Sequence, residues 1–156
     1  MSASSAHPGI SARSYRTAIQ ETTLVAAAVF ALVGILGFIP GITTRYSELA
    51  FAGADSGAML FGIFQVSVLH NIVHLLFGAV GLLMARTVAQ SKYFLIGGGV
   101  VYLVIWLYGL FIDQAGAANF IPVNTADNWL HLSLGVVMIA LGLLLGRGTV
   151  SERRTM

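Results

Sequence analysis

The fold is decided by one short stretch, Asn71-Ile-Val-His-Leu-Leu-Phe-Gly78, which recurs 57 residues later as Asn128-Trp-Leu-His-Leu-Ser-Leu-Gly135. Both copies follow the pattern Asn-x-x-His-x-x-x-Gly and stand in long apolar surroundings. Asn and His are uncommon in such surroundings, so their recurrence carries more weight than the matching apolar residues. The sequence therefore predicts an internal repeat.

On a helix, the amide, the imidazole and the glycine of each copy fall on one face. Polar groups inside a membrane are costly when they face lipid, so we expect both faces to turn inward. The repeat then predicts one cluster in the outer half of the bilayer, made of Asn71, His74, Asn128 and His131. His70 lies one turn before His74, and Asp127 is its counterpart in the second copy.

The composition identifies a membrane protein. Of the 156 residues, 57% are hydrophobic, only 9% are charged and none is Cys. Soluble domains carry about 25% charged residues, so a soluble enzyme, a disordered chain and a disulfide scaffold are all excluded. The formal net charge of +2 is too small for nucleic-acid binding, and we expect the lipid bilayer to be the main partner.

Four apolar segments give the architecture. About 20 helical residues cross a bilayer, and backbone groups in lipid must be satisfied internally, so these segments are predicted to be helices. The prediction is an all-α, four-helix transmembrane bundle built from two repeated helical hairpins. Its helices are expected at about residues 22–39, 67–85, 93–112 and 125–146 of a domain spanning 21–147, with flexible cytoplasmic tails at 1–20 and 148–156. Glycines such as Gly78 and Gly135, and the run Gly97 to Gly99, are expected at helix contacts.

The start of the second helix is open to two interpretations. In the second copy, Asn124 is a plausible N-cap with Asp127 reaching back to it, and Ser67 takes the cap position in the first copy. We therefore favour a start near Ser67, with the preceding apolar stretch packed over the outer mouth of the bundle. The alternative is one long tilted helix from Met59.

Basic residues set the expected orientation. Seven of the eight fall on one side of a four-crossing chain, and only Arg45 falls on the other. The positive-inside rule then places both termini in the cytoplasm, and the expected location is the cytoplasmic (inner) membrane.

The Asn/His cluster admits several interpretations. The simplest is structural, with Asn and His side chains hydrogen-bonding between facing helices and fixing their register. A metal site is a second possibility, in which His70, His74 and His131 bind Zn or Cu and Asp127 acts as a fourth ligand. A third is a b-type haem held by His74 and His131 as axial ligands, with Asn71 and Asn128 beside it.

Two further interpretations involve small molecules. A pH-sensitive imidazole could serve a proton-linked or small-solute site. Alternatively, a quinone or lipid could bind at the outer mouth, in a cleft lined by the aromatic residues Phe61, Phe64, Phe120 and Trp129. No motif for catalysis accompanies the cluster, so no catalytic residue and no cofactor is assigned.

Two motifs carry a family resemblance. His-Asn-x-x-His spans His70 to His74, and Asn-Thr-Ala-Asp-Asn-x-x-His spans Asn124 to His131. With the short basic loop before Tyr93, they resemble a family of small bacterial four-helix membrane proteins described as a domain of unknown function. The resemblance covers about residues 20–147 and implies an integral membrane protein with no assigned activity or cofactor. Gln65 departs from it, because the second copy has proline at that position.

The sequence thus predicts a non-enzymatic membrane protein. We expect an accessory or scaffold subunit whose Asn/His cluster is mainly structural, acting with a membrane protein partner or as a homo-oligomer. The competing hypothesis is a haem- or metal-binding protein that uses His74 and His131.

Overall fold

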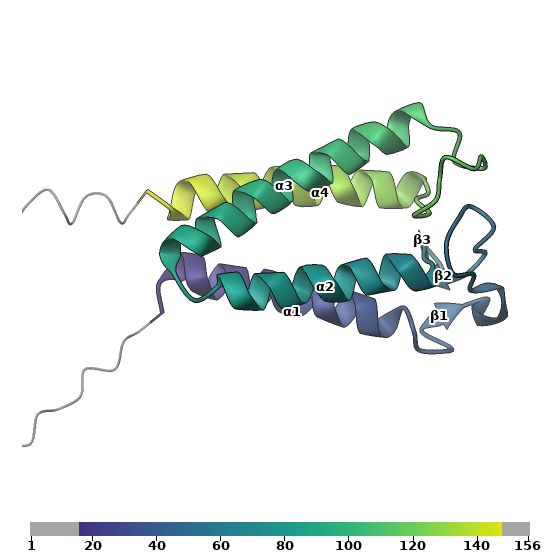
Figure 1. Cartoon of the computed structure of the whole chain (residues 1–156), viewed down its shortest axis with the longest axis horizontal. Helices are drawn as coiled ribbons and strands as arrows, with labels where there is room; N and C mark the ends of the chain where they lie inside the picture. The colour runs from purple at the N-terminus through teal and green to yellow at the C-terminus, as the bar shows by residue number, and fades with distance from the viewer. Residues whose placement is uncertain (1–15, 148–156) are drawn as a thin grey trace, which may run out of the picture.

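Four helices form two antiparallel hairpins in the computed structural model, which describes residues 16–147 (Figure 1). The first hairpin joins α1 (Ala18–Leu36) to α2 (Val68–Met84), and the second joins α3 (Val88–Phe111) to α4 (Thr125–Leu145). Each helix packs chiefly against its hairpin partner. Of the predicted tails, the structure describes only residues 16–20, of which α1 includes Ala18 to Gln20 and Thr17 is its N-cap.

The helices have the length and surface of membrane spans. Three of them, α1, α3 and α4, are long and apolar enough to cross a bilayer, whereas α2 is apolar but has 17 residues, at the lower limit for a span. Large apolar side chains point away from the bundle on every helix, as shown by Val25, Leu76, Val104 and Leu144, each at least 59% exposed. Such a surface suits lipid and confirms an integral membrane protein.

Local capping decides where the helices begin. The Ser67 hydroxyl accepts a hydrogen bond from the His70 backbone N–H at 3.1 Å, which confirms the favoured start of α2. Asn124 caps α4 in a reciprocal box with Asp127, as predicted. The predicted start of α3 at residue 93 was wrong by five residues. The helix begins at Val88 because the Thr87 hydroxyl caps it, so Lys92 lies within the helix.

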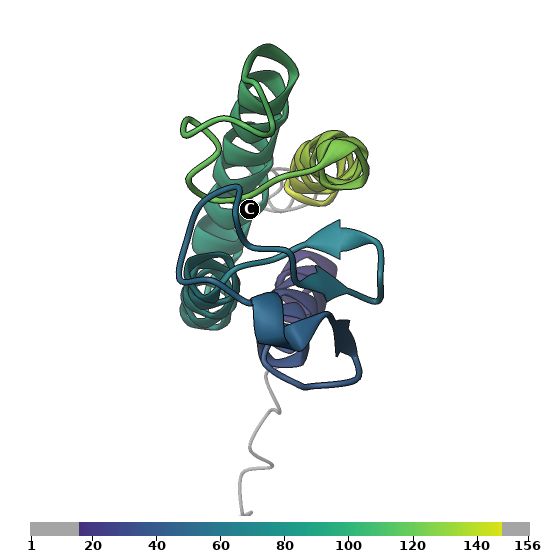
Figure 2. The ribbon, with the colours of Figure 1, turned by 90° about the vertical axis from the view of Figure 1, so that its right-hand side faces the viewer.

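The four predicted helices are confirmed, and a small sheet that the sequence did not predict covers one end of the bundle. It contains β1 (Thr43–Thr44), β2 (Met59–Leu60) and β3 (Phe64–Gln65), all antiparallel. A tight turn joins β2 to β3 because Phe61 and Gly62 both adopt left-handed φ angles, of 54° and 72°. Leu60 and Val66 are buried against α1, so the stretch before α2 does pack over the mouth of the bundle (Figure 2).

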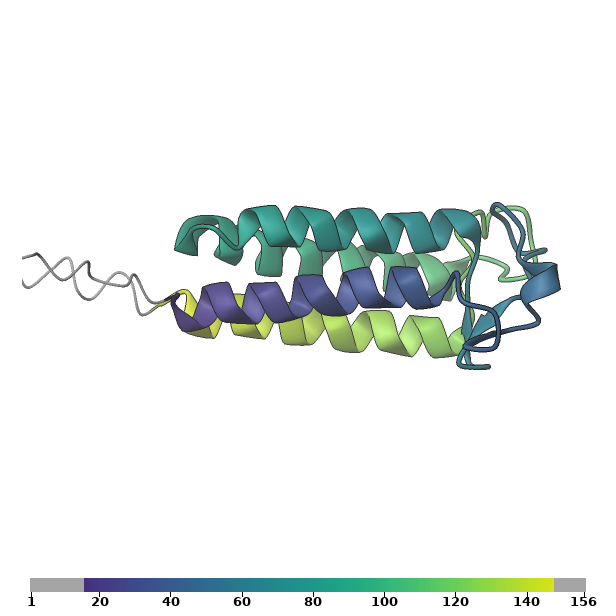
Figure 3. The ribbon, with the colours of Figure 1, turned by 90° about the horizontal axis from the view of Figure 1, so that it is seen from below.

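The sheet and both longer loops gather at one end of the molecule, which we name the sheet end (Figure 3). The opposite end, at the turn between α2 and α3, is the turn end. The start of α1 and the end of α4 also lie at the turn end. Of the basic residues described, Arg45 lies at the sheet end, where it pairs with Glu48 at 3.7 Å, and the others lie at the turn end.

Glycine lets the helices of each hairpin approach closely. A Cβ on Gly78 would lie 2.8 Å from the Ala31 backbone nitrogen, and one on Gly135 would lie 3.0 Å from the Gly99 carbonyl oxygen. Both predicted contacts are therefore confirmed. Gly97 is different, because a Cβ there would meet nothing within 4 Å.

An aromatic core joins the two hairpins. The rings of Phe30 in α1 and Tyr102 in α3 stack 5.4 Å apart, and Phe77 packs edge-on against both. α3 crosses the bundle obliquely, lying near α2 at the turn end and diverging from it toward the sheet end (Figure 1). The helices therefore separate at the end where the predicted histidine cluster lies.

Candidate functional site

A cavity of about 290 Å³ opens between the two hairpins toward the sheet end. Its walls come from α2, α3, the start of α4 and the loop before α4, and nearly all are apolar. The lining residues are His70, Val73, His74, Tyr102, Val104, Ile105, Tyr108, Phe120, Ile121, Val123 and His131. Val104 and Phe120 are 59% and 55% exposed, so the cavity reaches the lipid-facing surface between α2 and α3.

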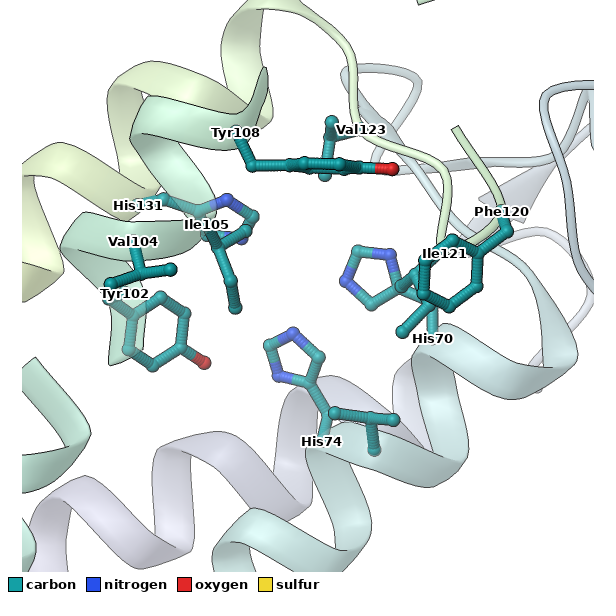
Figure 4. A pocket seen from close by; sticks show the side chains of 11 residues that line it. His70, His74, Tyr102, Val104, Ile105, Tyr108, Phe120, Ile121, Val123 and His131 are labelled. Carbon is teal, nitrogen blue, oxygen red and sulfur yellow. The ribbon is translucent and has the colours of Figure 1, made fainter. Parts of the chain in front are cut away.

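Three imidazoles project into this cavity (Figure 4). His70 and His74 lie one turn apart on α2, and their rings stack 4.9 Å apart. His131 enters from α4, with its ring 5.3 Å from that of Tyr102. The structure therefore brings together the histidines of the two copies, as the sequence predicted.

The two histidines of the repeated motif each have a ring nitrogen with no hydrogen-bond partner in the part of the chain that the structure describes. His74 and His131 are 8% and 5% exposed, and the Nδ1 atom of each is buried without a partner among the described residues. An unsatisfied buried polar group costs roughly 1–3 kcal/mol. The hydrogen bonds predicted between the two copies are therefore not formed at these atoms, although both histidines line the cavity.

The two asparagines do not join the histidines, which corrects the predicted cluster. The Asn71 amide packs against Gly37 at the end of α1, and the Asn128 amide packs against Gly109 in α3. Each amide thus lies inside its own hairpin, in space that only glycine leaves open. Asn71 Nδ2 and Asn128 Oδ1 are likewise buried without a partner.

His70 and Asp127 instead tie the two hairpins together at the sheet end. The Asp127 Oδ2 atom accepts hydrogen bonds from the backbone N–H groups of Gln65, at 3.0 Å, and Asn124, at 2.9 Å. A second contact joins α2 to the loop before α4, where His70 Nδ1 lies 3.1 Å from the Pro122 carbonyl oxygen. Gln65 offers an N–H to an acceptor, whereas Pro122 has no N–H and offers only a carbonyl to a donor. The carboxylate of Asp127 therefore suits the N–H of Gln65, and the imidazole of His70 suits the carbonyl of Pro122. The same difference explains why Gln65 is not a proline.

The geometry gives little support to the metal hypothesis. Within residues 16–147, no three His, Cys, Asp or Glu side chains are arranged to hold a metal ion. Imidazoles that bind metals almost always donate their second N–H to a neighbour. His70 has such a neighbour in Pro122, but His74 and His131 have none at Nδ1. Zn or Cu binding stays an untested prediction.

Sequence reasoning missed part of the cavity wall. Tyr102, Ile105 and Tyr108 come from α3, whose glycine- and aromatic-rich sequence contains no buried charge to mark a face. The Tyr108 hydroxyl donates to the Ala118 carbonyl, which fixes its ring beside the cavity. Of the aromatic residues predicted to line a cleft, Phe120 lines this cavity, whereas Phe61 and Phe64 line a smaller one between α1 and α4.

Comparison with known proteins identifies the family and no closer relative. Neither the curated proteins nor the solved structures include a match. A family described as "Domain of unknown function (DUF4383)" matches residues 20–144, which covers all four helices apart from their outermost turns. The chain, an integral membrane protein with four helices and a small sheet, therefore belongs to the DUF4383 family of unknown function.

Proposed function

We propose that this protein binds a lipid-soluble molecule in the imidazole-lined cavity between α2 and α3. The ligand would carry carbonyl or hydroxyl oxygens on a single-ring head group, as a quinone does, and its apolar remainder would extend into lipid. The protein itself would act as a non-enzymatic accessory subunit that holds the ligand for a membrane protein partner or for a second copy.

The observation that carries this proposal is a pair of histidines in an apolar cavity that reaches the lipid-facing surface, each with an Nδ1 atom that has no hydrogen-bond partner among the described residues. Ligand sites commonly combine apolar walls with a few polar groups that fix orientation. Here His74 and His131 supply those groups from opposite hairpins. Hydrogen bonds donated by these imidazoles to the oxygens of a ligand would offset part of the cost of burying the rings.

Haem is the second candidate, because His74 and His131 line one cavity and histidine is a common axial ligand of haem iron. The missing Nδ1 partners favour the first proposal, since an axial imidazole normally has one. Haem gives a strong Soret absorption band, so the absorption spectrum of the purified protein distinguishes the two candidate ligands.

The first prediction concerns what the purified protein carries. After extraction of the full chain in mild detergent, organic-solvent extracts should contain a lipid-soluble carbonyl or hydroxyl compound, identified by mass spectrometry. Its amount should fall at least about tenfold in His74→Phe and in His131→Phe, because phenylalanine keeps the ring and removes both nitrogens; a loss of roughly 1.4 kcal/mol gives that factor. Val137→Phe, on the exposed face of α4, is the matched control and should retain the compound.

Two outcomes would contradict this proposal. Equal amounts of the compound in wild type and both histidine variants would show that the cavity does not hold it. A Soret absorption band in the wild type that disappears in both variants would establish haem instead.

We also propose that all four helices span the membrane, with both termini in the cytoplasm of a bacterium. Apart from Arg45, the basic residues described gather at the turn end, and their positive charge favours the cytoplasmic side. The proposal therefore puts the sheet and the cavity in the outer half of the bilayer.

The absence of cysteine from the sequence makes this orientation easy to test. Ser47→Cys places one thiol at the exposed sheet end, and Gln90→Cys places one near the exposed turn end. A membrane-impermeant maleimide added to intact cells should label the first and not the second, while both react after the cells are lysed. The reverse labelling pattern would overturn the orientation.

A further inference from the structure

A second, smaller cavity of about 70 Å³ lies on the other side of the histidines, between α1 and α4. It shares His70, His74 and His131 with the larger cavity. His74 and His131, whose Nδ1 atoms have no partner within residues 16–147, therefore line both cavities.

Half of the residues that line only one of the two cavities correspond in position to residues that line only the other. In each of these pairs, one residue belongs to the first hairpin and the other to the second. The pairs are Phe64 and Ile121, Val66 and Val123, Val73 and Leu130, all 57 residues apart, and Val33 and Ile105. This correspondence is what a twofold relation between the hairpins would produce, since it exchanges the α2–α3 side with the α4–α1 side.

Two contacts support the same relation. Phe30 and Tyr102 are separated by the same 72 residues as Val33 and Ile105, and their rings stack almost parallel, at 9°. Gly37 and Gly109 share that spacing, and each packs on the asparagine of its own hairpin. Equivalent residues that contact each other at the centre of a bundle lie where a twofold axis would pass.

The two cavities differ because of the hairpin formed by β2 and β3. Leu60, Phe61 and Phe64 from this hairpin line the smaller cavity, and the loop before α4 provides no equivalent of the first two. Phe61 adopts a left-handed φ of 54°, a conformation that is unfavourable for a residue other than glycine, and its side chain is 54% exposed. The hairpin thus adds apolar side chains to the wall of the smaller cavity that have no counterpart in the larger one.

We infer that the space between α1 and α4 is a second binding site for the same class of lipid-soluble ligand, occluded by the β2–β3 hairpin. This inference rests on the proposed function of the larger cavity. The wild-type protein accordingly takes one ligand, which reaches the histidines only between α2 and α3.

The test counts the ligands bound after two phenylalanines of the β2–β3 hairpin have been replaced by smaller residues, in a variant that we call the trimmed protein. The probe is a decyl-substituted 1,4-benzoquinone, whose ring carries two carbonyl acceptors, and native mass spectrometry of the full chain in detergent gives the stoichiometry. Wild type should bind one probe molecule. The double variant Phe61→Gly/Phe64→Ala should bind two, because glycine suits the left-handed turn and neither phenylalanine belongs to the fully buried core.

Matched blocking variants assign each ligand to its side. Val73 and Leu130 occupy corresponding positions and are both 38% exposed, so tryptophan at either has room to turn into its cavity. Added to the trimmed protein, Val73→Trp and Leu130→Trp should each reduce two ligands to one. In the wild-type background, Val73→Trp should abolish binding and Leu130→Trp should leave it unchanged.

The outcomes separate this inference from the proposal on which it rests. A trimmed protein that still binds one molecule, or a wild type that binds two, would overturn the occluded second site while leaving the first intact. A wild type that binds no probe, with Val73→Trp also without effect, would count against the proposed function itself.

Discussion

Gly78→Ala is expected to lower the free energy of unfolding by about 1–3 kcal/mol, the usual cost of forcing extra volume into a close-packed contact. The new methyl group would lie 2.8 Å from the Ala31 backbone nitrogen and 2.9 Å from the Ala27 carbonyl oxygen. Backbone atoms cannot turn aside as a flexible side chain can, so α1 and α2 must move apart. Equilibrium unfolding in mixed micelles, followed by circular dichroism, measures the change.

Gly97 provides the matched control on α3. A Cβ there meets nothing within 4 Å, and alanine favours the helix over glycine by up to about 1 kcal/mol. Gly97→Ala should therefore leave stability unchanged or raise it. Equal effects at the two positions would show that close helix contact at Gly78 does not hold the first hairpin together.

Asp127→Ala is expected to have an effect of similar or greater size at the other end of the bundle. It removes the acceptor shared by the backbone N–H groups of Gln65 and Asn124, and each unsatisfied donor costs roughly 1–3 kcal/mol. We expect a total loss of about 2–4 kcal/mol in the free energy of unfolding. The same micelle unfolding assay applies.

A double-mutant cycle isolates the contact between the hairpins. Gln65→Pro deletes the N–H that Asp127 accepts and introduces the residue found at the corresponding position 122. In that background, Asp127→Ala should cost at least about 1 kcal/mol less than in the wild type. Gln65→Ala keeps the N–H and should leave the cost of Asp127→Ala unchanged, and a coupling near zero with proline would contradict the assigned hydrogen bond.

The sequence predicted the local features of the helices well. Ser67 and Asn124 identify helix starts because a capping side chain bonds to a backbone N–H only three residues away. Charge was a poorer guide, since Lys92 lies within α3 rather than before it. A long side chain can carry a charge from the end of a helix to the interface, so charge marks a boundary loosely.

The candidate site was predicted only in part. The spacing of His74 and His131 from their glycines places each ring on an inward face, and the two rings do line one cavity. The asparagines share that face by sequence, yet each packs on a glycine of its own hairpin. A face of a helix is wide enough to contact two neighbours, and the spacing of residues does not say which neighbour each side chain meets.

By itself, the sequence determined that this protein is a membrane protein of four helices, where two of the helices begin, and which imidazoles face inward. These properties depend on hydropathy, helical period and capping, which act over a few residues. The tertiary structure alone decided that α3 diverges from α2, that the β2–β3 hairpin fills one side, and that a cavity remains on the other. Those features follow from crossing angles and from packing between residues far apart in the chain, which no local pattern encodes.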